Sequence, residues 1–169
     1  MRTALDKLYD TAGWIAAAFM VALLVMVLLS ILGRQFGFHV RGTDAYAGYM
    51  MAGAGFFALA HTLKRGEHIR VTLLLQALGP VARHRMEMFS LAAAVLLSAL
   101  LAIFSIKLCW QSLQFHDIST SSDATPLWLP QIAMALGTLI LCVAFVDELV
   151  LEWQGLRASR GSDELLHNE

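Results

Sequence analysis

The sequence predicts an all-α integral membrane protein in which four helices cross the bilayer and both termini lie in the cytoplasm. Hydrophobic residues make up 58% of the 169 residues and charged residues only 15%, whereas a soluble domain has about 25% charged residues. The charges are also clustered. Between the clusters lie four stretches without Asp, Glu, Lys or Arg: residues 11–33, 45–63, 88–106 and 124–146.

Each uncharged stretch has the length of a membrane-crossing helix. The stretches contain 23, 19, 19 and 23 residues, and a helix needs about 20 apolar residues to cross a hydrocarbon core of roughly 30 Å. Strands of a membrane barrel alternate over about ten residues, so these runs predict helices. The first stretch is longer than the apolar core of a cleaved signal peptide, which indicates a retained span.

The connections between the stretches differ in length and pattern. Residues 34–44 form a short connection, which predicts that the first two helices are antiparallel neighbours. Residues 64–87 form a longer connection, in which apolar residues between 69 and 78 predict a short amphipathic helix on the cytoplasmic surface. Gly79 and Pro80 end that helix, and proline suits the first turn of the next one.

The third helix is expected to extend beyond its uncharged stretch. Apolar residues continue past Lys107, so the helix is predicted to run from residue 81 to residue 115, a length of about 52 Å. Residues 119–122 then form a polar loop on the outer side, and residues 147–169 form a cytoplasmic tail. The whole chain is predicted to be a single membrane domain.

Lys and Arg predict the orientation. Nine of the 12 lie on the side that holds both termini and the 64–87 connection, and three lie on the other side. Cytoplasmic connections carry an excess of Lys and Arg, which places the termini in the cytoplasm. Because indole rings prefer the membrane boundary, Trp110 and Trp128 are expected at the outer face and Trp14 and Trp153 at the inner face.

Small residues recur along one face of the second stretch. They stand at steps of three and four, which places them in one stripe: Ala45, Gly48, Ala52 and Gly55. The fourth stretch has a shorter version in Ala133 and Gly137. Small residues let helices approach closely in lipid, so both sets predict a helix-packing interface. Contact within this chain is favoured, and contact with a partner chain is the alternative.

Groups that could support chemistry are scarce. Carriers usually keep an ionisable group or a broken helix near the middle of the membrane, and here no stretch contains a charged residue. His61 stands near the end of the second stretch and is predicted to be interfacial, with a metal site shared with His68 as a weak alternative. Cys109 and Cys142 are predicted to be free thiols. No motif of an enzyme is present, and the balance of 12 basic and 13 acidic residues excludes a strongly basic nucleic-acid binder.

Residues 25–145 resemble the small membrane subunit of tripartite ATP-independent periplasmic (TRAP) transporters, the DctQ-like family. Four features carry the resemblance: the run Ile31, Leu32, Gly33, Arg34 that ends the first helix; Asp44, which opens a helix rich in small residues; the inner-side run of residues 63–71; and the run of residues 125–130 that opens the fourth helix. The segment Arg65-Gly66-Glu67-His68-Ile69-Arg70-Val71 is the most specific of them.

The resemblance implies a non-transporting scaffold in the bacterial inner membrane. In such systems a periplasmic protein captures an organic acid, and a large DctM-like permease subunit holds the substrate and sodium sites. The small subunit braces the permease and could help to dock the binding protein. No cofactor is expected in this chain, although phospholipid could bind. Lipid or interface contacts are expected at Arg34, Asp44, Lys64, Arg65, His68, Arg70, Trp110 and Trp128.

Three other classes compete with this interpretation. A haem-binding four-helix anchor of a respiratory enzyme needs facing histidines inside the bilayer, which a single His61 does not supply. A small drug antiporter needs a carboxylate in the membrane. A generic membrane assembly or anchor protein needs neither and is the main alternative. The sequence does not name the transported acid, because the residues that select it belong to other subunits.

Overall fold

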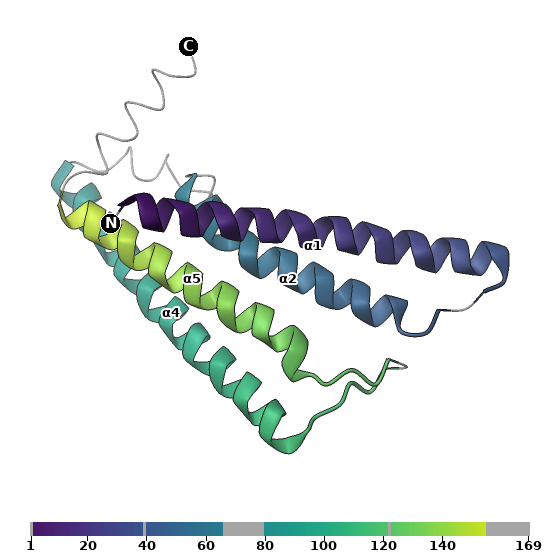
Figure 1. Cartoon of the computed structure of the whole chain (residues 1–169). Coiled ribbons are helices and arrows are strands. Elements are labelled where there is room, and N and C mark those ends of the chain that lie inside the picture. Colours follow the sequence, from purple (N-terminus) through teal and green to yellow (C-terminus); the bar gives the residue numbers. More distant parts are fainter. Residues whose placement is uncertain (1, 39, 66–79, 122, 155–169) are drawn as a thin grey trace, which may run out of the picture.

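The computed structural model describes residues 2–38, 40–65, 80–121 and 123–154 (Figure 1). They form four long helices, α1 (Arg2–Phe36), α2 (Thr43–Lys64), α4 (Pro80–Phe115) and α5 (Trp128–Trp153). The described ranges contain no strand, so the predicted all-α class is confirmed. The amphipathic helix predicted between residues 69 and 78 lies outside the described residues.

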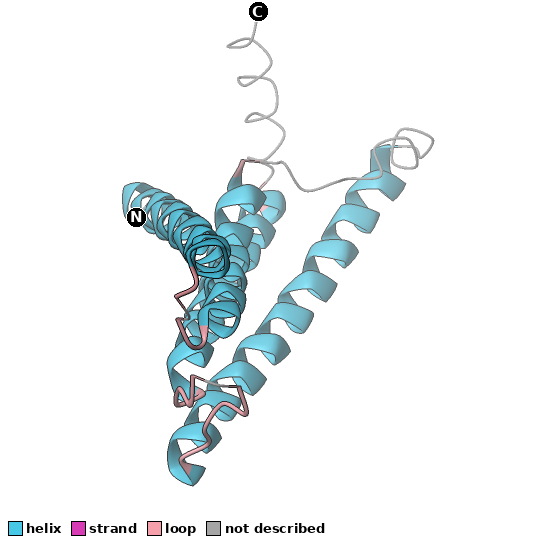
Figure 2. Ribbon diagram, turned by 90° about the vertical axis from the view of Figure 1, so that its right-hand side faces the viewer, coloured by secondary structure: helices cyan, strands magenta, loops and turns pink. Residues whose placement is uncertain are grey.

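The helices alternate in direction and pack in the order α1, α2, α5, α4. Close contacts join α1 to α2, α2 to α5 and α5 to α4. In Figure 2, α1 and α4 lie on opposite sides of the molecule, with α2 and α5 between them. The start of α1, the end of α2, the start of α4 and the end of α5 gather at one end, here called the terminal end (Figure 1). Residues 37–42 and 116–127 connect the helices at the opposite end, here called the loop end.

Three of the four helices are long and apolar enough to cross a membrane: Leu5–Phe36, Ala82–Phe115 and Trp128–Trp153. The helix α2 is not among them, because alanine, glycine, tyrosine and threonine replace much of the leucine and valine found in the others. The start of α1 and the end of α5 lie together at the terminal end, which suits an even number of crossings, but the count of four stays a prediction.

The third helix has the length that the sequence predicts, and the fourth begins later than its uncharged stretch. The helix α4 extends 36 residues from Pro80 to Phe115, about 54 Å. The helix α5 begins at Trp128, four residues after residue 124. Ala124 has a positive φ of 48°, and the proline at 126 disfavours a helical conformation for the residue before it. Residues 124–127 therefore belong to the loop.

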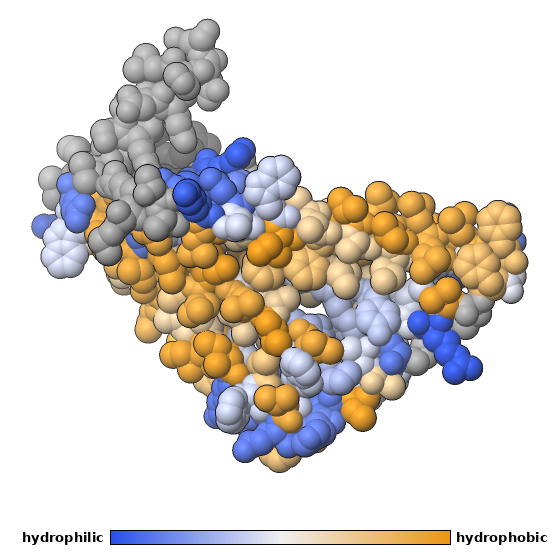
Figure 3. Space-filling view, viewed as in Figure 1, coloured by the Kyte–Doolittle hydropathy of each residue, from blue (hydrophilic) through white to orange (hydrophobic). Residues whose placement is uncertain are grey.

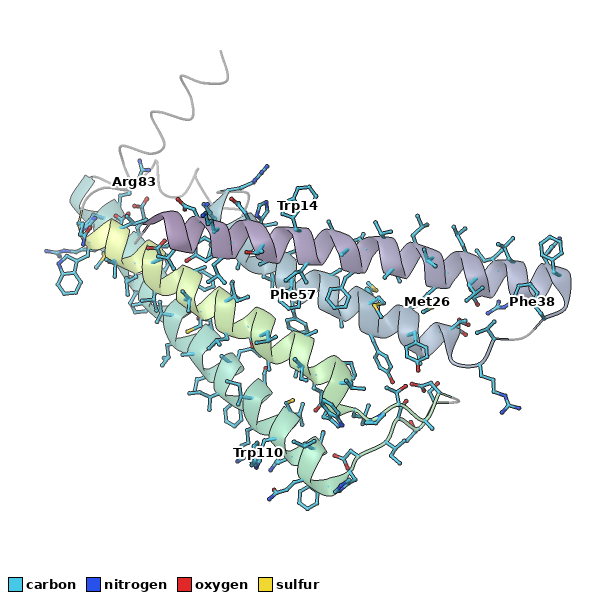
Figure 4. All side chains as sticks on the ribbon, viewed as in Figure 1. Trp14, Met26, Phe38, Phe57, Arg83 and Trp110 are labelled. Atoms are coloured by element: carbon cyan, nitrogen blue, oxygen red, sulfur yellow. The ribbon has the colours of Figure 1, made fainter. Side chains whose placement is uncertain are left out.

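The core lies where α1, α2 and α5 meet. One buried cluster near the terminal end contains Tyr9, Ala60, Leu63, Leu141 and Ala144. A second cluster, nearer the middle of the helices, contains Ala12, Ala16 and Phe57. The ring of Phe57 stacks on Phe19 with a centroid distance of 5.9 Å (Figure 4). Small residues of α1 and α2 thus surround one large aromatic pair.

Most large apolar side chains of α1 and α4 remain exposed. Figure 3 shows an apolar band over the helices, with hydrophilic residues concentrated toward the two ends. Exposed members include Val21, Leu24 and Ile31 on α1 and Leu97 and Phe104 on α4. A continuous exposed apolar surface of this kind marks contact with a membrane or with another protein.

Candidate functional site

A polar cluster at the loop end joins α2 to the loop before α5. The hydroxyl of Tyr49 lies 3.0 Å from Oγ of Ser119 and 3.3 Å from Oδ2 of Asp123. The Ser119 hydroxyl donates to Oδ1 of the same carboxylate at 3.0 Å. The hydroxyl oxygens of Thr125 and Tyr46 lie 3.0 Å apart. Three of these contacts connect residues at least 70 positions apart in the chain.

The backbone around this loop-end cluster fits closely. Gly42 precedes α2 with a φ of 81°, and a Cβ atom at that position would lie 2.6 Å from Cβ of Asp123. Glycine is therefore required there for both its conformation and its size. The pKa of Asp123 lies below its ordinary value of 3.8. A hydrogen bond from the Thr125 hydroxyl is the largest cause, and hydrogen bonds from Ser119 and Tyr49 lower the pKa further. Desolvation of the carboxylate raises the pKa but does not outweigh them.

The sequence did not single out this loop-end cluster. Residues 119–122 were expected to form a polar loop, and Thr125 appeared only in the resemblance. Tyr46 and Tyr49, three residues apart on one face at the start of α2, are the signal that could have indicated it. Two interfacial tyrosines on one helix face need polar partners for their hydroxyl groups. The partners could not be identified, because they come from a distant loop.

Arg34 and Asp44, both predicted to contact lipid or the interface, lie close to each other at the loop end. The guanidinium of Arg34 is 3.8 Å from a carboxylate oxygen of Asp44. The hydroxyl of Ser30 also donates to this carboxylate, at 3.3 Å. Both charged side chains are largely exposed, and an exposed ion pair contributes at most about 1 kcal/mol. The pair joins the end of α1 to the start of α2.

The two tryptophans predicted for the outer boundary also stand at the loop end. Trp110, near the end of α4, is 64% exposed. Trp128 begins α5 and is half-buried, and its backbone carbonyl accepts a hydrogen bond from the Cys109 thiol at 3.6 Å. Cys109 and Cys142 are both free thiols, as predicted.

Basic residues at the terminal end have unequal surroundings. Nζ of Lys64 lies 2.9 Å from a carboxylate oxygen of Asp6 and 5.7 Å from the centre of the Tyr9 ring. Lys64 is thus paired within the chain. Arg65, the next residue, is exposed. His68 and Arg70, which were also predicted to contact lipid or the membrane interface, lie outside the described residues.

Two carboxylates are buried at the terminal end, although the sequence placed them in the tail. Glu148 is 9% exposed and Glu152 is 7% exposed. Oε1 of Glu152 lies 3.0 Å from Nδ1 of His84, which joins the end of α5 to the start of α4. The buried positions Leu141 and Ala144 precede these residues at helical spacing, so Glu148 and Glu152 continue the same buried face. That spacing could have predicted their burial.

Among the described residues no neighbour covers most of the stripe on α2, which does not support the prediction that the stripe packs within this chain. Gly48, Ala52 and Gly55 are exposed, and a Cβ atom at Gly48 or Gly55 would meet nothing within 4 Å. Ala45, at the start of the stripe, is partly buried. Spacing alone defines a stripe but does not identify the neighbour that covers it. Contact of this stripe with a partner chain stays a proposal.

Small residues outside this stripe make the close helix contacts, and Ala133 and Gly137 of α5, which were predicted to pack, are among them. A Cβ atom at Gly137 of α5 would lie 2.7 Å from the backbone carbon of Phe56 on α2. One at Gly53 of α2 would lie 3.0 Å from the ring of Phe19 on α1. Ala133, on α5, packs against the second core cluster. The backbones of α2 and α5 therefore approach closely at Gly137.

Potential metal ligands are not clustered in the part of the chain that the structure describes. No group of three or more His, Cys, Asp or Glu residues in the described ranges could hold a metal ion. His61, the one histidine in an uncharged stretch, donates from Nδ1 to the backbone carbonyl of Tyr9 at 3.2 Å. Three long apolar helices, exposed apolar faces and ionic groups gathered at the two ends define an all-helical integral membrane protein.

Comparison with known families places the chain within this class. Residues 23–155 match the family of tripartite ATP-independent periplasmic transporters, DctQ component. The match covers more than three quarters of the chain, so the chain belongs to this family, as the resemblance in the sequence indicated. Among curated proteins no match was found. Members are inner-membrane components of TRAP transporters and work with a large permease and a periplasmic binding protein.

Proposed function

We propose that this chain is the non-transporting scaffold subunit of a sodium-coupled TRAP transporter for organic acids. The central parts of its helices carry the proposal. Residues 11–33, 45–63, 88–106 and 124–146 contain no charged side chain. Sodium and a carboxylate substrate both need polar or charged ligands at the depth where they cross. The large permease would supply those ligands, and this chain would bind no sodium and no cofactor.

The uncovered stripe on α2 supports a role in assembly. Gly48, Ala52 and Gly55 are exposed, and a Cβ atom at either glycine would meet none of the described residues within 4 Å. The helix α2 is also less apolar than the other three, which makes it the least suited to face lipid. A helix of the large permease packed on this face would bury it, since small residues allow close approach in a membrane.

The loop-end cluster supports contact with the periplasmic binding protein. With four crossings and the termini in the cytoplasm, residues 116–127 face the periplasm. Contacts between Tyr49, Ser119 and Asp123 tie this loop to α2. A surface that is ordered before binding loses less entropy on association than a mobile one.

Reconstitution tests the proposed role. The chain alone in liposomes should take up no organic acid under a sodium gradient, with or without binding protein. The large permease with this chain and the binding protein should take it up, and omission of this chain should abolish uptake while the permease loses thermal stability. Sodium-driven uptake by this chain alone would contradict the proposal. Full uptake by the permease and binding protein without it would do so as well.

A further inference from the structure

An open pocket lies between the starting region of α1 and the end of α2. Its volume is about 390 Å³, and its lining includes Asp10, Gly13 and Trp14 from α1 and His61 and Arg65 from α2 and its cap. The pocket is at the terminal end, at the boundary between charged and uncharged sequence. Asp10 is the last charged residue before the uncharged stretch 11–33, and Arg65 follows the stretch 45–63 by two residues.

The pocket presents one positive and one negative group that have little compensation within the described ranges. Lys64 is paired with Asp6 at 2.9 Å, whereas no ion pair involves Arg65 in the described ranges. The carboxylate of Asp10 is 60% exposed, and its contact within those ranges is the imidazole of His61 at 3.9 Å. A guanidinium and a carboxylate at one pocket complement a ligand that carries both a negative and a positive charge.

Glycine at position 13 shapes the floor of the pocket. A Cβ atom there would lie 2.9 Å from Nδ1 of His61. Its absence lets the imidazole lie against α1, where Nδ1 donates to the carbonyl of Tyr9 at 3.2 Å. The ring is therefore fixed by a hydrogen bond and by close packing, and the space beside it stays open.

The position of Trp14 indicates that the ligand is a lipid. The indole is 77% exposed and projects from α1 away from the other helices (Figure 4). Indole rings prefer the head-group level of a membrane. Residues beyond Trp14 on α1 include exposed apolar side chains such as Met20 and Val21, which would accompany an acyl chain. The pocket thus combines a charged mouth with an apolar continuation along one helix.

We propose that this pocket binds the head group of an aminophospholipid, a phosphodiester that also carries a primary ammonium group. The guanidinium of Arg65 would donate to the phosphate oxygens, a contact that arginine makes with two parallel hydrogen bonds. Asp10 would accept from the ammonium group, and the Trp14 ring would offer it a cation–π contact. An anionic glycerol head group leaves Asp10 without a cation. A choline head group has no N–H to donate.

Native mass spectrometry of the full chain in detergent tests the site. The probes are dioleoyl lipids with ethanolamine, glycerol or choline head groups, mixed in equal amounts in one sample. The wild-type chain should retain one ethanolamine lipid with about tenfold preference over either competitor, a difference that corresponds to one good charged contact. Equal retention of the three lipids would overturn the proposal.

Two substitutions test the positive and the negative group of the pocket one at a time. Arg65→Gln should lower retention of all three lipids about tenfold. Asp10→Asn should abolish the preference for ethanolamine over glycerol and leave total retention similar. Arg85→Gln is the matched control, because Arg85 is an exposed arginine of the terminal end on α4, and it should change neither value. The lipid ratio that tests Asp10→Asn is read from folded, lipid-bound chains in a single sample, so partial unfolding of that variant does not alter it.

Soluble competitors distinguish a lipid from a free phosphate compound. Inorganic phosphate and glycerophosphoethanolamine are added at the concentration at which the lipid saturates the chain. Neither should displace the lipid, because both lack the acyl chains that lie along α1. Displacement by either compound would overturn the lipid assignment. Behaviour of Arg65→Gln or Asp10→Asn like the Arg85→Gln control would overturn the assigned contacts.

Discussion

The hydroxyl of Tyr49 on α2 lies 3.3 Å from a carboxylate oxygen of Asp123, a residue 74 positions later in the chain. The α1–α2 pair and the α5–α4 pair diverge toward the loop end in Figure 1, and this contact links α2 to the loop that leads into α5. Ser119 touches both partners, at 3.0 Å in each case. A small polar network therefore connects two helical pairs at the end where their helices lie farther apart.

We predict that Tyr49 and Asp123 are energetically coupled. Tyr49→Phe and Asp123→Asn should each lower the thermal midpoint of the purified chain. The double variant should lose less stability than the two single losses combined, because contacting residues typically show coupling of about 0.5–3 kcal/mol. Asp117→Asn, an exposed carboxylate of the same loop, is the control and should change the midpoint little. Additive effects of Tyr49→Phe and Asp123→Asn would contradict the coupling.

The loop end should also loosen in acid. The folded state lowers the pKa of Asp123 below 3.8, so the unfolded state binds the proton more tightly. Asp123 therefore contributes stability above pH 3.8 that is lost as the pH falls below this value through the folded pKa. The protection of backbone amides in this loop against hydrogen exchange, taken relative to the intrinsic exchange rate at the same pH, should therefore fall in that range. In Asp123→Asn this protection should already be low at neutral pH and should not change further at the same acid step; an equal change would exclude Asp123 as the cause.

The sequence predicted the helices well because the features that define a helix, such as a run of apolar residues without charge, lie within the segment that forms it. The absence of charge between Glu87 and Lys107, and the apolar residues that follow, were enough to predict a helix that reaches Phe115. Proline at 126 could have predicted the later start of α5, since its effect on the preceding residue is also local.

Contacts between segments were predicted less well because they depend on which faces meet. Gly48, Gly53 and Gly55 all lie on α2 and look alike in the sequence. Only Gly53 is a packing position, because the ring of Phe19 lies against it. Likewise Asp123 has no local signal, since its partner Tyr49 is brought near by the fold. Glu148 was assigned to a solvated tail because charge outweighed its helical spacing from Leu141 and Ala144.

The contact between His84 and Glu152 should contribute more to the unfolding free energy than the neighbouring pair of Arg83 and Glu87. Nδ1 of His84 lies 3.0 Å from the buried carboxylate of Glu152. His84→Ala should cost roughly 1–3 kcal/mol of unfolding free energy, because a buried carboxylate loses one of its partners. Arg83→Ala removes the exposed pair with Glu87, which lies four residues away on the same helix, and should cost about 0.5 kcal/mol or less. Similar losses in chemical unfolding would show that burial of Glu152 is unimportant.

The orientation can be tested by labelling single cysteines in a Cys109→Ser, Cys142→Ser background. Ser121 is exposed at the loop end and Arg85 is exposed at the terminal end. With nine of the 12 Lys and Arg residues on the side of the termini, that side should be cytoplasmic. Ser121→Cys should therefore react with an impermeant thiol reagent added to intact cells, and Arg85→Cys should react only after permeabilisation. The reverse pattern would invert the topology.

The two kinds of glycine on the helices should respond differently to substitution. Gly137→Leu places a side chain where a Cβ atom already lies 2.7 Å from the backbone of Phe56, and it should destabilise the isolated chain by about 1–3 kcal/mol or more. A Cβ atom at Gly55 would meet no atom of the described residues within 4 Å, so Gly55→Leu should cause no clash there. Leucine also favours a helix more than glycine does, so the isolated chain should keep its thermal midpoint.

Gly55→Leu should impair assembly with the large permease, although the isolated chain tolerates it. If the permease covers the stripe on α2, the added side chain separates the two surfaces, and co-purification and uptake should both fall. Met51→Leu is the control, because Met51 is an exposed residue of α2 outside the stripe and the change conserves volume. Normal assembly of Gly55→Leu with the permease would show that the stripe faces lipid, and it would leave the exposed faces of α1 and α4 as the surfaces through which the scaffold acts.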